Sequence, residues 1–322
     1  MKYKYIYLAI VFIFIGFLIN SFYIAPSIDI VKGAGPVFSE NWVNSMNWIK
    51  NNTAECTVIA TYWDPGHFIA EVARRATVFD GAHQNDLFTI TREGNLTDSE
   101  ILQLAPTGKY SVQKKEVNGT LYTFVATARI QDIGTSLSTS NETLAYDILK
   151  RYNKPGCKEM YFLATADLIG KAHWWTYFAS WNPVDKGKAS DYLMLGLSQA
   201  RPVVQQNAIA YTFAFGQQQA FVIYDRNDTL SAYLQQGNQF ADIEKLFYFS
   251  RNGQPTLIQN QNSQVKGMIW LDPSRQTMVF IPPELEDAIF TRMFFFNGAG
   301  LQKFEYVNAW GGEVKLFRIQ LS

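Results

Sequence analysis

Hydrophobic residues along the chain fall into short runs separated by turn-forming residues, a pattern that predicts a mixed α/β fold. The runs at 57–61 and 160–164 are short and rich in β-branched or aromatic residues. They are typical of buried strands in a parallel sheet. Helical spacing of apolar residues and N-terminal capping residues predict four helices, at 39–52, 98–105, 140–151 and 172–181.

Between these elements, Pro65 is expected to begin a further helix, and 77–79 a second strand, so that a βαβ-like unit forms. Asn118-Gly119 predicts a hairpin turn within strands spanning 108–131. From about residue 200, aliphatic-aromatic runs alternate with Gly, Asn and Gln turns, which indicates antiparallel β structure. A helix at 283–295 and a strand at 314–319 are expected to end the chain.

The N-terminus carries an almost entirely apolar stretch at 5–24, about the length that spans a ~30 Å hydrocarbon core. Lys2 and Lys4 precede it, so the positive-inside rule places the rest of the chain outside the cytoplasm. A cleaved signal peptide is the alternative, but the stretch is long and lacks a small-x-small cleavage site. We therefore expect a single-pass protein of the cell membrane with an extracytoplasmic C-terminal domain.

The expected fold class is an α/β central core with a partly parallel sheet, a β-rich C-terminal region and a single N-terminal transmembrane helix. The corresponding boundaries are 1–25 for the transmembrane helix, 26–200 for the core and 201–322 for the β-rich region.

Composition and charge exclude one class of partner. The 322 residues are 48% hydrophobic and carry no formal net charge, so we expect no nucleic-acid partner, because phosphate binding needs a basic face. Asn-x-Thr sequons suggest a chain that is itself N-glycosylated outside the cytoplasm, although turn chemistry also favours Asn and Thr. These sequons begin at Asn51, Asn95, Asn118, Asn141 and Asn227.

Two cysteines stand just before the two predicted parallel strands, Cys56 before the first and Cys157 before the second. If the strands are adjacent, both thiols lie at the same edge of the sheet. A disulfide is then chemically allowed outside the cytoplasm. Two unrelated buried thiols are an equally good interpretation, since pairing requires Cα atoms within about 7 Å.

Polar and aromatic residues follow each of these strands. Residues 62–67 read Tyr-Trp-Asp-Pro-Gly-His, and Asp167 and Lys171 precede an aromatic helix. Ligands of open α/β sheets bind beyond the carboxyl ends of the strands, so the two segments are candidates for one site. An indole N–H and a carboxylate can hold a hydroxyl between a donor and an acceptor. An ordinary turn and a helix packed in the core are the competing interpretations.

The chain's three histidines offer another chemistry. With Asp64, the imidazoles of His67, His83 and His173 would suit Zn²⁺ or Fe²⁺. None of them has the i, i+4 spacing of a helical metal motif, and histidines in turns are commonly satisfied polar residues. A metal-dependent hydrolase that uses these groups is therefore a rival hypothesis.

Residues 62–66, Tyr-Trp-Asp-Pro-Gly, resemble the Trp-Trp-Asp-Tyr-Gly signature of the catalytic subunit of oligosaccharyltransferase, especially its archaeal single-subunit form. The resemblance extends over most of 26–322. It includes the helix with Trp42 and Trp48, the segment 80–84 and the closing segment 291–305. It identifies the chain as similar to the C-terminal domain of that subunit.

The resemblance implies recognition of Asn-x-Ser/Thr acceptors, with Tyr62, Trp63 and Asp64 holding the Ser/Thr hydroxyl. Lys171 and Trp175 stand at the Lys and Met places of the family's second motif. Leu168 occupies the place of its Asp, so Asp167 lies one residue early. The expected acceptor-binding residues are Tyr62, Trp63, Asp64, Pro65, Gly66, Lys171 and Trp175, with Asp167 and His67 as secondary candidates. No catalytic or metal-binding residue is assigned.

The resemblance also implies a missing part. The family's metal-binding carboxylates and lipid-linked donor site belong to a polytopic membrane region, whereas this chain has one apolar span. We therefore expect no cofactor in this chain, Mn²⁺ or Mg²⁺ in a polytopic membrane half, and no glycosyl transfer without that half. The expected partners are an acceptor polypeptide, the membrane half and the lipid bilayer. A non-catalytic cell-surface binding protein is the second rival.

Overall fold

A computed structural model of the chain describes residues 12–17, 19–24, 39–82, 86–198, 203–205 and 207–321. It divides into two units, Met1–Asn44 and Ser45–Ser322, and each is described by itself. In the first unit, 12–17 is helical and η1 (Asn20–Ile24) is a π-helix. The predicted span at 5–24 includes 5–11 and 18, which lie outside the described residues. Among the helices that are described, none has both the length and the apolar character needed to cross a bilayer.

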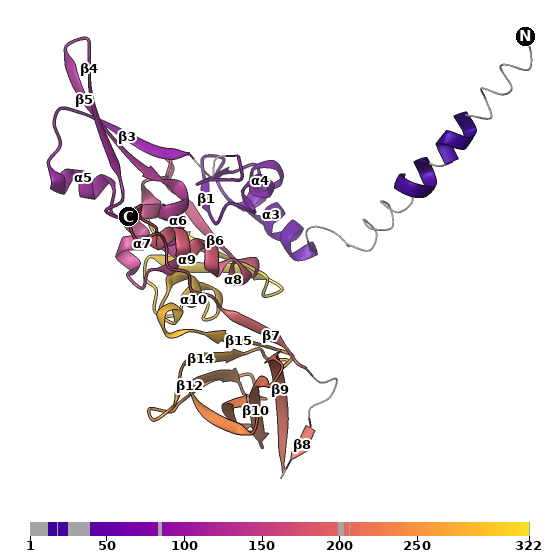
Figure 1. The fold of residues 1–322 in the computed structure, drawn as a ribbon. Helices are drawn as coiled ribbons and strands as arrows, with labels where there is room; N and C mark the ends of the chain where they lie inside the picture. The colour runs from indigo at the N-terminus through magenta and orange to yellow at the C-terminus, as the bar shows by residue number, and fades with distance from the viewer. Residues whose placement is uncertain are drawn as a thin grey trace, which may run out of the picture. The chain divides into compact units, whose positions relative to one another are not determined.

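The second unit is built on a mixed sheet with the strand order β16-β17-β6-β1-β2. β1 pairs in parallel with both β2 and β6, and Val58 lies beside Met160. Figure 1 labels β1 and β6 within this unit. β17 and β16 add to the other edge in antiparallel fashion. The predicted partly parallel α/β core is therefore confirmed. Its strands are β1 (Val58–Ala60), β2 (Ala76–Thr77), β6 (Met160–Thr165), β16 (Phe304–Trp310) and β17 (Val314–Ile319).

Helices complete the core of this unit, since α6, α7, α9 and α10 bury apolar side chains in the same core as β1 and β6. α6 lies so close to α9 that a Cβ on Gly134 would come within 2.5 Å of the Trp175 carbonyl oxygen. Only glycine therefore fits at this crossing. The helices are α3 (Glu40–Asn52), α4 (Gly66–Phe68), the π-helix η2 (Ile69–Ala73), α5 (Asp98–Leu104), α6 (Arg129–Ser138), α7 (Glu142–Lys150), α8 (Asp167–Gly170), α9 (Ala172–Ser180), the 3₁₀-helix η3 (Pro283–Leu285) and α10 (Ile289–Phe294).

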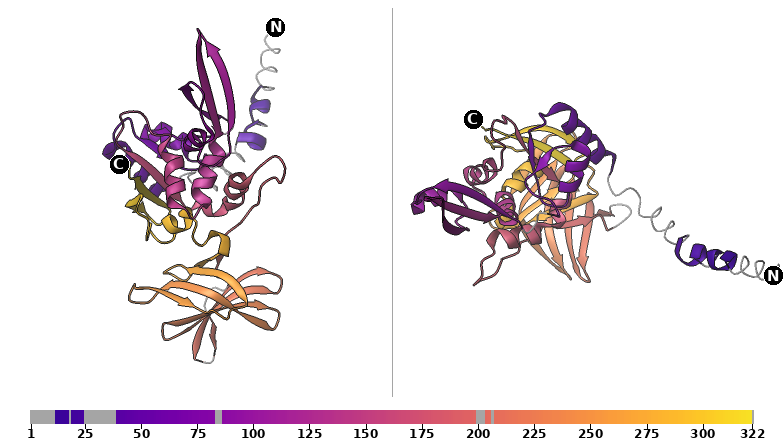
Figure 2. Two further views of the ribbon diagram at one scale, coloured as in Figure 1. Left: turned by 90° about the vertical axis from the view of Figure 1, so that its left-hand side faces the viewer. Right: turned by 90° about the horizontal axis from the view of Figure 1, so that it is seen from above.

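A β-rich region is also confirmed, as a second sheet with the order β7-β15-β14-β12-β11-β10-β9-β8, on which β13 pairs with β12. It spans 193–281 rather than the predicted 201–322, because β16 and β17 belong to the first sheet. Figure 2 shows its orange strands curving round as one strongly twisted sheet. β7 pairs antiparallel with β15, so the chain enters and leaves this sheet through neighbouring strands. The strands are β7 (Leu193–Gly196), β8 (Val203–Gln205), β9 (Ala208–Gly216), β10 (Gln219–Arg226), β11 (Thr229–Gln236), β12 (Gln239–Phe249), β13 (Pro255–Gln259), β14 (Val265–Leu271) and β15 (Thr277–Ile281).

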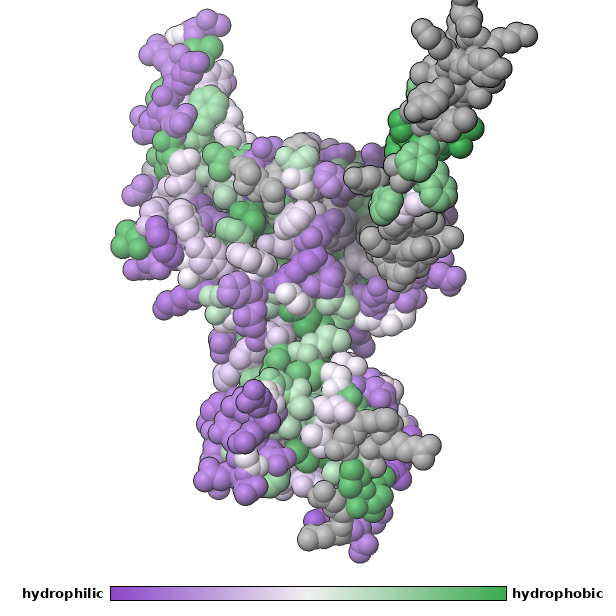
Figure 3. All heavy atoms as spheres, turned by 45° about the vertical axis from the view of Figure 1, so that its right-hand side comes forward, coloured by the Kyte–Doolittle hydropathy of each residue, from purple (hydrophilic) through white to green (hydrophobic). Residues whose placement is uncertain are grey.

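A third sheet contains the predicted hairpin. β4 (Ser111–Val117) and β5 (Thr120–Ala128) are joined at Asn118-Gly119, and both turn residues have positive φ, of 51° and 78°. β3 (Leu87–Glu93) pairs with the other side of β5. The far end of the hairpin is mostly hydrophilic on the face seen in Figure 3. The strands predicted over 108–131 end earlier than expected, because α6 begins at Arg129.

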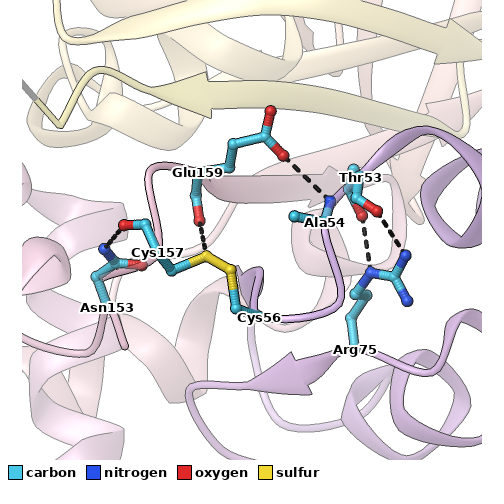
Figure 4. Close-up of a disulfide and its surroundings, with 7 residues drawn as sticks. All are labelled: Thr53, Ala54, Cys56, Arg75, Asn153, Cys157 and Glu159. Atoms are coloured by element: carbon cyan, nitrogen blue, oxygen red, sulfur yellow. Dashed lines mark hydrogen bonds between the residues drawn. A yellow bond between two sulfur atoms is a disulfide. The ribbon is translucent and has the colours of Figure 1, made fainter. Parts of the chain in front are cut away.

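The two cysteines form a disulfide, which settles the question that the sequence left open. Cys56 and Cys157 have Cα atoms 5.7 Å apart and are 101 residues apart in sequence (Figure 4). The loop before β1 is fixed further by Arg75, whose guanidinium donates to the hydroxyl and carbonyl oxygens of Thr53. Glu159 accepts a hydrogen bond from the Ala54 amide at 3.2 Å. The starts of β1 and β6 are therefore joined covalently and by hydrogen bonds.

We expect reduction of this disulfide to lower the free energy of unfolding by about 2–5 kcal/mol, because it closes a long loop. Urea unfolding of the protein with and without reductant measures the loss. The variant carrying both Cys56→Ser and Cys157→Ser is the control and should not respond to reductant. An unchanged unfolding midpoint of the wild-type protein in reductant would contradict this expectation.

Candidate functional site

The two polar segments picked out from the sequence meet at one edge of the first sheet. The loop after β1 carries Trp63 and Asp64, and α8 with its following residue carries Asp167 and Lys171. Because β1 and β6 are adjacent and parallel, both segments leave the sheet at the same end. Between them lies a cavity of about 450 Å³. It is lined by Tyr62, Trp63, Asp64, Ile130, Gly170, Lys171, Trp174 and Phe178.

Lys171 joins the two segments electrostatically. Its Nζ lies 2.9 Å from Asp64 Oδ2 and 2.8 Å from Asp167 Oδ2. Burial lowers the pKa of Lys171, but hydrogen bonds and charges from Asp167 and Asp64 outweigh it, so the net direction is upward. Lys171 is therefore an ammonium at neutral pH. Asp167, one residue early relative to the family motif, is thereby brought into the cluster.

Tyr62 and Trp63 form the aromatic wall on the β1 side. Tyr62 is 2% exposed, and its ring meets Phe79 edge to face at 6.0 Å. Burial and the charge of Asp64 raise the pKa of Tyr62 to about 12, although a hydrogen bond with the Trp63 side chain lowers it. Tyr62 thus keeps its proton at neutral pH and belongs more to the wall than to the open surface, while Trp63 is partly exposed.

Pro65, Gly66 and His67 shape the turn behind the cavity. The Gly66 amide donates to the Trp63 carbonyl at 3.1 Å, which closes the turn. A Cβ on Gly66 would lie 2.6 Å from Asp80 Cβ, so a larger residue cannot be accommodated there. Pro65 is buried, and the exposed His67 lies 3.7 Å from Asp80. Among the described residues, these three are not part of the cavity lining.

The aromatic helix α9 presents a different tryptophan from the one expected. Trp175 has no exposed surface, and its indole N–H donates to the Leu168 carbonyl at 2.9 Å. Its ring packs against Phe290 in the core. Trp174 is 55% exposed and lines the cavity, stacked on Phe178 one helical turn later. Trp175, the residue in the place of the family's Met, therefore belongs to the core next to the site.

Four cavity residues were missed by the sequence analysis, namely Ile130, Gly170, Trp174 and Phe178. The spacing of Trp174 and Phe178, four apart on a predicted helix, was the available signal for those two. No such signal pointed to Ile130, because this residue lies on α6, in a segment that was interpreted as strand.

The histidines do not gather around Asp64. His173 Nδ1 lies 3.1 Å from Asp191, and His67 pairs with Asp80. His83 lies outside the described residues. Within the described ranges, no three His, Cys, Asp or Glu side chains are placed to hold a metal ion. These residues therefore do not fit a metal centre, and no chemical step through a metal is derived for this chain.

Curated proteins that are similar to this chain include dolichyl-phosphooligosaccharide-protein glycotransferases. The chain is 25% identical over 314 residues to the dolichyl-phosphooligosaccharide-protein glycotransferase of Methanocaldococcus jannaschii, which covers 85% of this chain and 33% of that protein. A segment is 44% identical over 46 residues to glycotransferase 2 of Pyrococcus horikoshii, covering 14% of this chain and 6% of that protein. The chain thus spans about a third of the length of its M. jannaschii relative. No family model matches it.

Two solved structures are similar at a lower level. The C-terminal domain of C. jejuni PglB gives a TM-score of 0.46 at 12% identity, covering 87% of this chain and 99% of that one. The C-terminal globular domain of oligosaccharyltransferase from Pyrococcus abyssi also gives 0.46, at 10% identity, covering 87% and 50%. The resemblance to the oligosaccharyltransferase catalytic subunit that the motifs predict is confirmed by the sequence similarity.

The two neighbouring tryptophans of α9 should respond oppositely to truncation. Trp175→Ala is expected to lower the free energy of unfolding by about 3–5 kcal/mol, because it opens a cavity in the core. Trp174→Ala should cost about 1 kcal/mol or less, since its ring is mostly exposed. Chemical denaturation of the two variants measures the difference. Equal losses would contradict the assignment of Trp175 to the core and Trp174 to the site.

Proposed function

We propose that residues 45–322 recognise Asn-x-Ser/Thr acceptor segments for an oligosaccharyltransferase that N-glycosylates proteins from a lipid-linked oligosaccharide. The observation that carries this proposal is the cluster of Asp64, Lys171 and Asp167 in an aromatic-walled cavity beyond two adjacent parallel strands. The similarity to the M. jannaschii glycotransferase supports the same reaction class.

The cluster has donor and acceptor capacity to spare for one hydroxyl. An ammonium has three N–H donors, and Lys171 uses one of them in its hydrogen bond to Asp167, while Asp64 is its ion-pair partner. A remaining donor can reach the hydroxyl oxygen of an acceptor Ser or Thr. Asp64 Oδ2 and Asp167 Oδ1 are buried and lack a well-aligned hydrogen bond within the described part of the chain. Asp64 can therefore accept the hydroxyl's own hydrogen bond.

The apolar part of the cavity lining would take the rest of the acceptor. Ile130, Trp174 and Phe178 line the cavity from α6 and α9. The threonine methyl and a neighbouring side chain would pack on these groups. An acceptor without the hydroxyl would bury the charged cluster without a partner, and this penalty is what gives the site its selectivity.

The transfer reaction itself is assigned to a second part of the assembly. Glycosyl transfer to an amide nitrogen by this class of enzyme uses Mn²⁺ or Mg²⁺, and the described residues provide no ligand set for either. We therefore assign the cation and the lipid-linked donor to a polytopic membrane half. This chain would hold the acceptor outside the cytoplasm, next to the bilayer.

A non-catalytic surface protein that has retained the fold is the second candidate, and acceptor binding distinguishes the two. The full chain in detergent should bind an Asn-x-Thr peptide more tightly than its Asn-x-Ala counterpart by about 1–3 kcal/mol. Asp64→Ala should remove the difference, because Asp64 accepts the hydroxyl's hydrogen bond. Isothermal titration measures both peptides. Asp191→Ala, an exposed carboxylate on the His173 side, is the matched control. Equal binding of the two peptides by the wild-type chain would refute acceptor recognition.

Transfer should require the membrane half. We expect no glycopeptide from the purified chain with acceptor peptide, lipid-linked donor and Mn²⁺ or Mg²⁺. Addition of a polytopic partner should produce it, and Asp64→Ala should reduce the yield at limiting peptide, because the acceptor is held less tightly. Mass spectrometry of the peptide gives the readout. Turnover by the chain alone would disprove the division of labour.

A further inference from the structure

A second cavity lies on the outer face of the β-rich sheet, over β10, β11 and β12. Its volume is about 530 Å³, within the range of about 300–1,000 Å³ typical of small-molecule sites. None of its residues takes part in the site at the end of β1. It is lined by Tyr224, Arg226, Thr229, Leu230, Ser231, Tyr233 and Phe240.

Three aromatic rings from three adjacent strands form its floor. Tyr224 and Tyr233 meet edge to face with centroids 5.9 Å apart, and Tyr233 and Phe240 do so at 6.3 Å. Phe240 is 50% exposed, although it is a large apolar side chain. The neighbours of Tyr233 on β11 show which face this is, since Ala232 points into the core on the opposite side. The three rings therefore lie on the outside of the sheet, with Phe240 the most exposed of them.

Polar groups alternate with these rings. Strand register places Ser231 opposite Tyr224 and Asp242 opposite Tyr233, so these side chains share one face. Arg226 stands opposite Thr229 at the end of the same hairpin. The cavity thus offers the Arg226 guanidinium and the hydroxyls of Thr229 and Ser231 beside three rings, while Asp242 lies on the same face outside the lining. It has both donors and acceptors.

We propose that this face binds a neutral saccharide of about one to three units. A sugar ring has an apolar C–H face, which suits packing on tyrosine or phenylalanine. Its rim of hydroxyls both donates and accepts, which matches Arg226, Thr229 and Ser231. This proposal concerns a site separate from acceptor recognition and does not depend on it.

Other ligand classes fit the face less well. Nucleic acid or another polyanion needs a clearly basic surface, and among the described residues that line this cavity Arg226 alone is basic. An extended peptide cannot be added as a strand, because β11 is already paired with β10 on one side and β12 on the other.

The test is a titration of the full chain, held in a detergent without a sugar headgroup, with maltotriose, mannotriose and triacetylchitotriose. At least one should bind with a Kd in the high micromolar to millimolar range, measured by calorimetry and by saturation-transfer NMR. Tyr233→Ala should weaken binding about tenfold or more. Arg226→Gln, at an exposed position, tests the rim without disturbing the core and should weaken binding several-fold.

Two controls separate this proposal from its alternatives. Tyr306→Ala removes an exposed tyrosine from β16 in the other sheet and should leave saccharide affinity unchanged. Asp64→Ala should also leave it unchanged, so failure of acceptor recognition is distinguishable from failure here. The proposal is overturned if none of the trisaccharides binds the wild-type chain, or if Tyr233→Ala and Arg226→Gln bind like wild type. Binding of a peptide or an oligonucleotide instead, lost in Tyr233→Ala, would also overturn it.

Discussion

The parallel pairing of β1 with β6 is the constraint on which the candidate acceptor site depends. These strands are far apart in sequence, yet their register brings two polar loops to the same end of the sheet. The Cys56–Cys157 disulfide joins the opposite ends of the same two strands. The disulfide thus joins the two strands where they begin, and the contacts of Lys171 join the loops that follow them. The site is rigid for reasons that lie mostly outside it.

Charge inside the site is nearly self-compensating. Lys171 faces two carboxylates, so the cluster carries about one net negative charge at neutral pH. Partial burial makes such a cluster sensitive to what displaces water from it, because a low local dielectric strengthens each contact. The hydroxyl of the proposed acceptor can join this cluster without adding charge.

Local sequence signals predicted much of the fold and part of the site. The buried strand β6 and the Asn118-Gly119 turn follow from patterns that act over a few residues. The pairing of the cysteines and the contact between Lys171 and Asp64 depend on long-range packing, which spacing alone does not determine. Helix phase explains the exchange of Trp175 for Trp174, since a one-residue shift rotates a side chain by about 100°. Ile130 was missed because the end of β5 was not recognised.

The connection through β7 and β15 has a consequence for how this chain can vary. Leu193–Gly196 and Thr277–Ile281 lie side by side and antiparallel, so everything between them is topologically an insertion into the α/β core. An insertion whose two ends meet can lengthen, shrink or be exchanged while the chain that surrounds it keeps its path. Relatives can therefore diverge in this module while retaining the strands that carry Asp64 and Lys171. An insertion of this kind allows the surface between β7 and β15 to change while the site at the end of β1 and β6 is retained.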